Sequence, residues 1–236
     1  CGNNGARFVS RINAIADVLA RKVATQHAQE FALLAGTWGN GIFTTGTAVG
    51  QVNSSNEYIM QTLKSNGDIF PLGLQALRIA QMKAGMTDVV GFGGTDMWSY
   101  LEALNIGCCQ DSGIDLLASL NRNRLVYGYD KRLEAAQGAS NRAMIMRLGS
   151  VVPLFYIANT WKDGIAQAGS DYLHTTIFDP KWGMPMDLTI KDNCGVITAA
   201  VAVSTKLIAV PSDQFQTNDP YFGINGVAKI RITNPS

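Results

Sequence analysis

A strand-like run, a cluster of glycines and a helix-like run follow one another in VVGFGGTDMWSYLEAL, residues 89–104. This order could hold a phosphate, because the first backbone N–H groups of a helix point towards an anion bound there. A Walker-type phosphate loop also requires Gly-Lys-Ser/Thr, whereas Gly94 is followed here by Thr95 and Asp96. A carboxylate at that position repels phosphate. We therefore interpret Gly91–Thr95 as a tight turn, with Thr95 or Asp96 capping the following helix.

Thiols are the second candidate for chemistry. The cysteines are Cys1, Cys108, Cys109 and Cys194, and the histidines are His27 and His174. Neighbouring cysteines make a strained disulfide, and a zinc site needs three or four converging ligands. Cys109 with His174 and Asp171 could form a thiol triad, but no local motif supports it. We expect no metal, no cofactor and reduced, mostly buried thiols, which fits synthesis in a reducing compartment.

Serine and carboxylate chemistry find no better support. The chain has no G-x-S-x-G nucleophile motif, and many carboxylates stand beside Gly, Pro or Asn, where Asp favours turns and caps. Asp111 and Asp115 lie four residues apart and could share a helix face, which alone is weak support for a metal. We therefore expect that the protein is not an enzyme. A small enzyme that uses the Gly91–Thr95 turn or Cys109 is the alternative.

The composition favours an assembling protein. The 236 residues are 47% hydrophobic and only 16% charged, against about 25% charged in typical soluble domains, so other subunits are one candidate for covering the surface. The net charge of +1 provides no strong field towards nucleic acid. No stretch reaches the roughly 20 apolar residues that span a bilayer, and we expect no membrane partner.

The elements that would position these residues divide the chain into a helical half and a strand-rich half. Apolar residues at helical spacing predict a helix from about Arg7 to Gly36, and a second helix over residues 70–85, with Pro71 in its first turn and Gly85 as its cap. Runs from RAMIMRL onwards are β-rich and separated by Gly, Pro, Asn and Asp. This separation predicts an α+β fold rather than repeated βαβ units.

A glycine-rich segment between the two helices, Gly36–Tyr58, predicts an extended hairpin or long loop that packs on a neighbouring subunit. Trp38, Phe43 and Tyr58 are isolated aromatic residues within it. Exposed aromatic residues are typical interface anchors, so we predict that these three form part of a subunit interface. The alternative is that they fill gaps beneath loops.

The order of the elements resembles that of the major capsid proteins of tailed bacteriophages, whose shell fold is shared with encapsulins. TWGNGIFTTGTAVGQVNSSNEY, residues 37–58, stands where that family has its extended loop. Residues 71–85 and then 89–104 look like its spine helix followed by a strand and a short helix. RLGSVVPLFYIANTW, residues 147–161, is similar to a segment before the late strands, and residues 178–233 look like the closing β elements.

The resemblance implies a phage-capsid-like α+β fold with an extended loop, a spine helix, and peripheral and axial domains. We accordingly expect an N-terminal helix or arm at residues 1–35, the extended loop at 36–68 and the peripheral and axial core at 69–236. The implied function is that of a structural virion protein, a self-assembling subunit of an icosahedral shell that encloses phage DNA.

The implied partners are copies of the same chain, arranged in hexamers and pentamers, and packaged DNA contacted without sequence readout. The first helix offers cations for that contact: Arg7, Arg11, Arg21 and Lys22. The resemblance implies no cofactor, synthesis in the cytoplasm of a bacterial host and a final place in the virion. Another phage structural protein or a bacterial compartment shell protein is the alternative within this class.

Overall fold

The computed structural model describes residues 4–34, 38, 43–86, 88–107, 126–156, 172–181, 183–193, 196–209 and 226–234. The chain divides into two compact units, each considered by itself below. Unit 1 comprises residues 1–27 and 153–207, and unit 2 comprises residues 28–152 and 208–236. Both contain helix and strand, which confirms the α+β class. Their boundaries differ from the three consecutive segments expected, because each unit is built from two separate stretches of chain.

Helix α1, Asn4–Leu33, contributes its first 24 residues to unit 1. Its buried stripe consists of Ile12, Ala16, Ala20 and Val23, which follow one another at spacings of three and four residues. This spacing places them on one side of a helix. The helix predicted from about Arg7 is thereby confirmed, although it starts earlier and ends at Leu33. Gly36, its expected end, lies outside the described residues.

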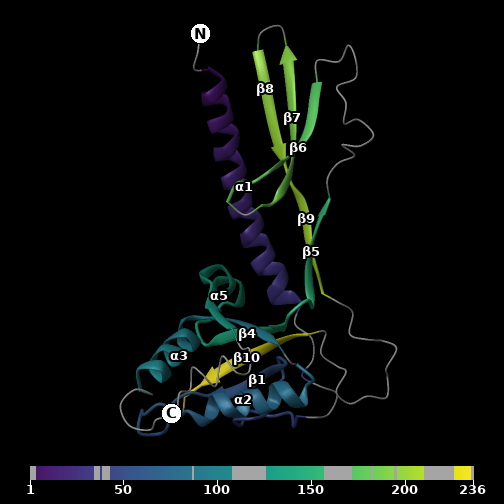
Figure 1. Ribbon diagram of the computed structural model, residues 1–236. Coiled ribbons are helices and arrows are strands. Elements are labelled where there is room, and N and C mark those ends of the chain that lie inside the picture. The colour runs from purple at the N-terminus through teal and green to yellow at the C-terminus, as the bar shows by residue number, and fades with distance from the viewer. Residues whose placement is uncertain are drawn as a thin grey trace, which may run out of the picture. The chain divides into compact units, whose positions relative to one another are not determined.

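Three antiparallel strands complete the core of unit 1, in the order β6-β7-β8 (Figure 1). They are β6, Tyr172–Phe178, β7, Pro185–Asn193, and β8, Val196–Ala202. The small side chains of Ala16 and Ala20 pack with Met186 and let the helix lie close to the sheet. The shorter strands β5, Val151–Tyr156, and β9, Ser204–Ala209, form a separate two-stranded sheet.

Unit 2 is built on a mixed five-stranded sheet in the order β1-β10-β4-β2-β3. In chain order the strands are β1, Glu57–Gln61, β2, Val89–Gly93, β3, Val126–Tyr129, β4, Arg142–Arg147, and β10, Val227–Thr233. Strands β1 and β10 are parallel, as are β2 and β3, whereas β4 runs antiparallel to both β10 and β2. The last of these strands in the sequence, β10, therefore lies inside the sheet, where it is yellow in Figure 1.

Helices α2, Leu72–Lys83, and α3, Thr95–Gly107, supply the main core of unit 2. Leu77 of α2 and Met97 of α3 are fully buried with Ile145 and Ile230 of the sheet. Helix α5, Lys131–Gln137, contacts β2 and β4. Gly85 adopts φ +69° directly after α2, as expected of a helix-ending glycine. The longest described helix is α1, with 30 residues, whereas the resemblance placed the spine helix over the 12-residue α2.

The glycine-rich segment folds back on its own sheet. The N–H of Ile59 donates to Gln51 O at 2.9 Å, that of Gly50 donates to Ile59 O at 2.9 Å, and that of Asn53 donates to Glu57 O at 3.0 Å. These bonds cover the edge of β1 that β10 does not pair, and covered edges avoid unwanted strand pairing. Residues 50–59 thus have partners inside unit 2, which differs from the expected arm that reaches over a neighbour.

Candidate functional site

The backbone N–H groups of Gly94, Thr95 and Asp96 are not available to a phosphate, because each already donates a hydrogen bond within the protein. The N–H of Gly94 donates to Arg142 O at 3.0 Å, and that of Asp96 donates to Ser140 O at 3.3 Å. The N–H and the hydroxyl of Thr95 both donate to one carboxylate oxygen of Glu134, at 2.6 and 2.7 Å. A carboxylate from α5 therefore takes the place of an anion at the start of α3. The expected helix start is confirmed, but the capping group comes from Glu134.

Close packing explains the glycines of this turn. A Cβ atom at Gly91 would overlap the ring of Tyr127, and a Cβ atom at Gly94 would overlap the carbonyl oxygen of Ser140. The turn between β2 and α3 is thus tightly packed against β3 and α5. This agrees with the interpretation of Gly91–Thr95 as a tight turn. No feature near residue 95 in the sequence points to Glu134, which lies 39 residues further along the chain.

Several sequence candidates lie outside the described residues. These are Cys1, Cys108, Cys109, Cys194, Asp111, Asp115 and Asp171. Of the thiol triad only His174 is described; its Nε2 lies 3.7 Å from an oxygen of Asp187, and Thr189 Oγ1 lies 3.4 Å from its Nδ1. Within the described part of the chain, no three His, Cys, Asp or Glu side chains gather as a metal site would require. No helix there is long and apolar enough to cross a bilayer.

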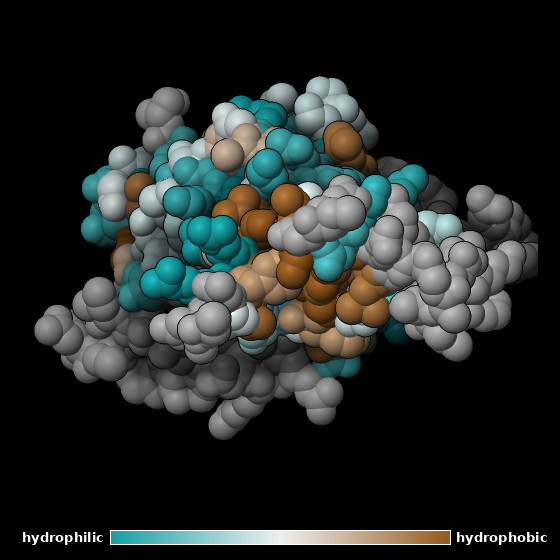
Figure 2. Space-filling model, turned by 90° about the horizontal axis from the view of Figure 1, so that it is seen from above, coloured by the Kyte–Doolittle hydropathy of each residue, from teal (hydrophilic) through white to brown (hydrophobic). Residues whose placement is uncertain are grey.

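Unit 1 carries much apolar side chain on its surface. Among its described residues nine large apolar side chains are exposed, namely Val9, Ile15, Val18, Leu154, Tyr156, Leu173, Phe178, Val196 and Ile197, whereas six apolar residues are buried. Figure 2 shows brown, apolar side chains grouped near the centre of one face of the molecule. Val196 and Ile197 at the start of β8 are 63% and 59% exposed. Groups of this kind mark protein interfaces more often than single exposed apolar residues do.

The four cations predicted on the first helix share one face of α1. With 3.6 residues per turn, Arg7, Arg11, Arg21 and Lys22 fall within an arc of about 100° opposite the buried stripe, and all four side chains are exposed. Arg21 forms an ion pair with Asp17, at 2.6 Å between Nη2 and Oδ2. Arg7 and Arg11 have no ion pair among the residues that the structure describes. The face therefore keeps a net positive charge towards its amino-terminal end.

The predicted interface aromatics lie in the core of unit 2. Trp38 and Tyr58 are buried, and Phe43 packs against both, with ring centroids between 5.2 and 5.8 Å apart. The indole N–H of Trp38 donates to Lys229 O at 2.7 Å. These contacts provide a role within the subunit, and their assignment to a subunit interface stays a prediction.

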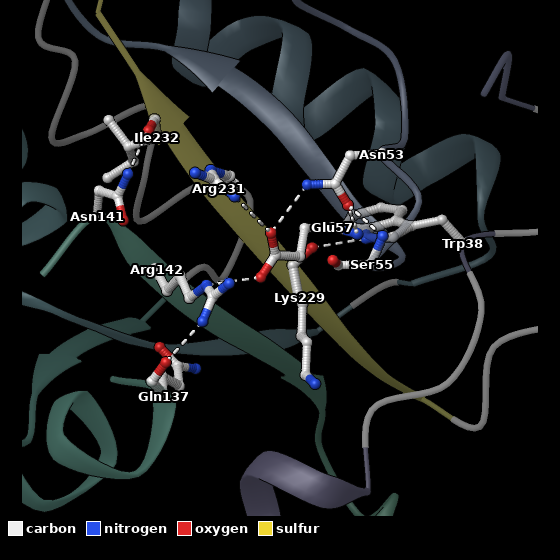
Figure 3. A network of polar contacts seen from close by, with 10 residues as sticks. All are labelled: Trp38, Asn53, Ser55, Glu57, Gln137, Asn141, Arg142, Lys229, Arg231 and Ile232. Atoms are coloured by element: carbon white, nitrogen blue, oxygen red, sulfur yellow. Dashed lines mark hydrogen bonds and ion pairs between the residues drawn. The ribbon is translucent and has the colours of Figure 1, made fainter. Parts of the chain in front are cut away.

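A buried carboxylate that sequence reasoning missed lies beside this cluster. Glu57 of β1 has an oxygen 2.8 Å from Arg142 Nε and another 3.6 Å from Arg231 Nη1, and it accepts a hydrogen bond from Asn53 Nδ2 at 2.9 Å (Figure 3). The network joins β1, β4, β10 and the preceding loop. The only local sequence signal for this network is an acidic residue at the start of an apolar strand. That pattern predicts a turn as readily as a buried ion pair.

Comparison with known proteins adds no relative: no protein-family model, no curated protein and no solved structure matches this chain. What the protein does is therefore inferred from the surface of unit 1 and the polar groups of unit 2.

Proposed function

We propose that this protein is the self-assembling structural subunit of a shell, of the kind that major capsid proteins of tailed bacteriophages form around DNA. The observation that carries the proposal is the exposed apolar surface of unit 1. Its described core is small, with two alanines among the six buried apolar residues. A unit that exposes more large apolar side chains than it buries gains stability when another protein surface covers them.

Strand β8 is the part of this surface that we expect to contact another subunit. Its sequence, VITAAVA, contains neither proline nor charge, although soluble proteins usually protect an edge strand with such residues. Among the described strands β8 pairs only with β7. A second copy of the same chain can cover strand β8, because a neutral strand in a chain of net charge +1 meets no strong electrostatic repulsion from that copy.

The positive face of α1 is proposed to contact the packaged DNA. Such contact needs cations near phosphates and no base readout, so it suits a few exposed arginines on a chain that is close to neutral. In this proposal the protein needs no cofactor and no catalysis, and it functions in the virion after synthesis in a bacterial cytoplasm. The backbone N–H groups of Gly94–Asp96 already donate hydrogen bonds within the protein. This supports a structural role for the turn rather than nucleotide binding.

The test is the assembly state of the wild-type chain and of Ile197→Asp, by light scattering after size exclusion and by negative-stain microscopy. Wild type should form particles far larger than the 25.4 kDa monomer. Burying a whole Ile side chain contributes about 1.5–3 kcal/mol, and Ile197 still has 59% of its surface to bury. A gain of roughly 1–2 kcal/mol per contact is therefore lost in the variant, before the cost of burying its charge.

Ile79→Asp is the matched control, because Ile79 is exposed on α2 in unit 2. It should keep the wild-type assembly, while Ile197→Asp should remain a folded monomer or small oligomer whose thermal midpoint falls only by the effect of the carboxylate of Asp192 opposite it on β7. A wild-type protein that stays monomeric across salt and concentration would disprove the shell proposal. Equal assembly of all three proteins would show that β8 does not form the contact.

A further inference from the structure

Unit 2 contains a cavity that the assembly proposal does not use. It has a volume of about 170 Å³ and lies between the last turn of α1, helix α5 and the strands β1, β4 and β10. Its polar lining comes from Glu57, Gln137, Arg142 and Lys229, and Ala32 and Leu33 contribute an apolar side. Three strands and helix α5 thus bring four polar side chains to one small space.

Gln137 has a side chain whose hydrogen-bonding groups are unused. The residue is 9% exposed, and neither Nε2 nor Oε1 of its amide has a partner among the described residues. Its backbone is fixed, because Arg142 Nη1 donates to Gln137 O at 2.7 Å. Buried amide groups are nearly always satisfied in native proteins, so an unpaired amide calls for a ligand or water.

The charges around the cavity do not cancel. The charged side chains that line the cavity are Arg142, Lys229 and Glu57, which leaves a net charge of +1, and Arg231 lies 3.6 Å from Glu57 outside this lining. Both oxygens of Glu57 are already engaged by the two arginines and Asn53. The side chain of Lys229 extends away from Glu57 in Figure 3, and its ammonium has no ion pair within the described part of the chain. An anion is the ligand charge that this arrangement favours.

We propose that the cavity binds a small oxyanion that also carries a hydrogen-bond donor, of the hydrogen phosphate class. The ammonium of Lys229 and the amide Nε2 of Gln137 donate to its oxygens, and its hydroxyl donates to Gln137 Oε1. Arg142 supports the charge from the wall of the cavity. This pairing uses both groups of the amide, which a fully deprotonated anion such as sulfate cannot do.

The size of the cavity limits the ligand. At about 30 Å³ for each water, the space holds roughly five or six water molecules, or one phosphate-sized ion with a few waters. Pockets for drug-sized ligands and cofactors measure about 300–1,000 Å³, so this space is too small to enclose a whole nucleotide. The inference concerns unit 2 alone and does not depend on shell assembly.

Binding is tested with inorganic phosphate and with sulfate at matched ionic strength and neutral pH, using ³¹P line broadening for phosphate and calorimetry for both. Phosphate should bind saturably and at least about five-fold more tightly than sulfate, as an unpaired buried acceptor costs 1–3 kcal/mol, or roughly 5–150-fold. Lys229→Met should weaken phosphate binding at least ten-fold. Gln137→Leu should weaken it and remove the preference over sulfate.

Lys206→Met is the matched control, since Lys206 is an exposed lysine on β9 of unit 1, and it should bind phosphate as wild type does. Far-ultraviolet circular dichroism checks that each variant folds. If Gln137→Leu does not fold, the wild-type preference and Lys229→Met decide the result. Phosphate and sulfate effects that are equal, unsaturable or unchanged by Lys229→Met would show that the cavity holds only water and an adventitious ion.

Discussion

Replacing Glu57 by Gln removes the charge at the centre of the polar network of unit 2 while keeping the shape of the side chain. The carboxylate is buried, and Arg142 Nε lies 2.8 Å from it. Breaking a fully buried ion pair costs about 3–5 kcal/mol. The side chain of Arg142 is 33% exposed, however, so it regains part of its hydration when the carboxylate is removed. The loss of this charged contact therefore costs about 1.5–3 kcal/mol.

The other two partners of Glu57 add less. The hydrogen bond from Asn53 contributes about 1 kcal/mol. Arg231 is 45% exposed and 3.6 Å away, and a pair of that kind contributes at most about 0.5 kcal/mol. Glu57→Gln should therefore lower the free energy of unfolding of unit 2 by about 2–4 kcal/mol, which corresponds to a fall of roughly 6–12 °C in Tm for a unit of this size.

Urea titration followed by tryptophan fluorescence measures this change, because Trp38 is buried in the same unit. Calorimetry separates the transitions of the two units. Arg231→Gln should cost less than about 1 kcal/mol, and Glu102→Gln, on the exposed surface of α3, should stay within about 0.5 kcal/mol of wild type. A loss below 1 kcal/mol for Glu57→Gln, or a loss equal to that of Arg231→Gln, would refute this account of the network.

Two further predictions concern the face of α1 and a buried phenol. The double variant Arg7→Gln, Arg11→Gln should weaken DNA binding and reduce the slope of log association constant against log salt concentration by about 2. Arg21→Gln should have less effect, because Asp17 already pairs with Arg21. Equal effects of the two changes in filter binding would contradict this. Burial raises the pKa of Tyr100 to about 12, so its contribution to stability is present below pH 10 and is lost as the pH rises through about 12. Tyr100→Phe should lower the free energy of unfolding by about 1 kcal/mol at neutral pH, because the hydrogen bond to Phe70 O is lost. In urea titrations at alkaline pH its free energy of unfolding should fall less steeply with pH than that of wild type. An identical decline would exclude this role of Tyr100.

Local patterns predicted those elements whose cause is local. The apolar spacing along α1 and the glycine at position 85 each determine structure within a few residues, and both expectations agree with the fold. Pairings over long distances left no such signal. Glu57 of β1 stands in register with Lys229 of β10, and no pattern near either residue identifies the other. The division into two discontinuous units has the same origin.

The candidate sites divide in the same way. The absence of a lysine after Gly94 was enough to disfavour a phosphate loop, because that chemistry depends on neighbouring residues. The surroundings of Trp38 and Tyr58 were not predictable, since a glycine-rich context indicates a loop but not which side of the loop faces solvent. The cavity beside Gln137 required the meeting of α1, α5 and three strands, which only the tertiary fold provides.

The interior position of β10 affects the order in which unit 2 can form during synthesis. Strand β1 is made before the other four strands of its sheet, and its sheet partner β10 follows about 170 residues later. At about 5–20 residues per second, β1 waits roughly 10–30 s before β10 can join it to β4. The nascent chain therefore cannot complete this sheet until nearly all of its described residues have left the ribosome, which delays the finished subunit, and any association that requires it, until after translation of the rest.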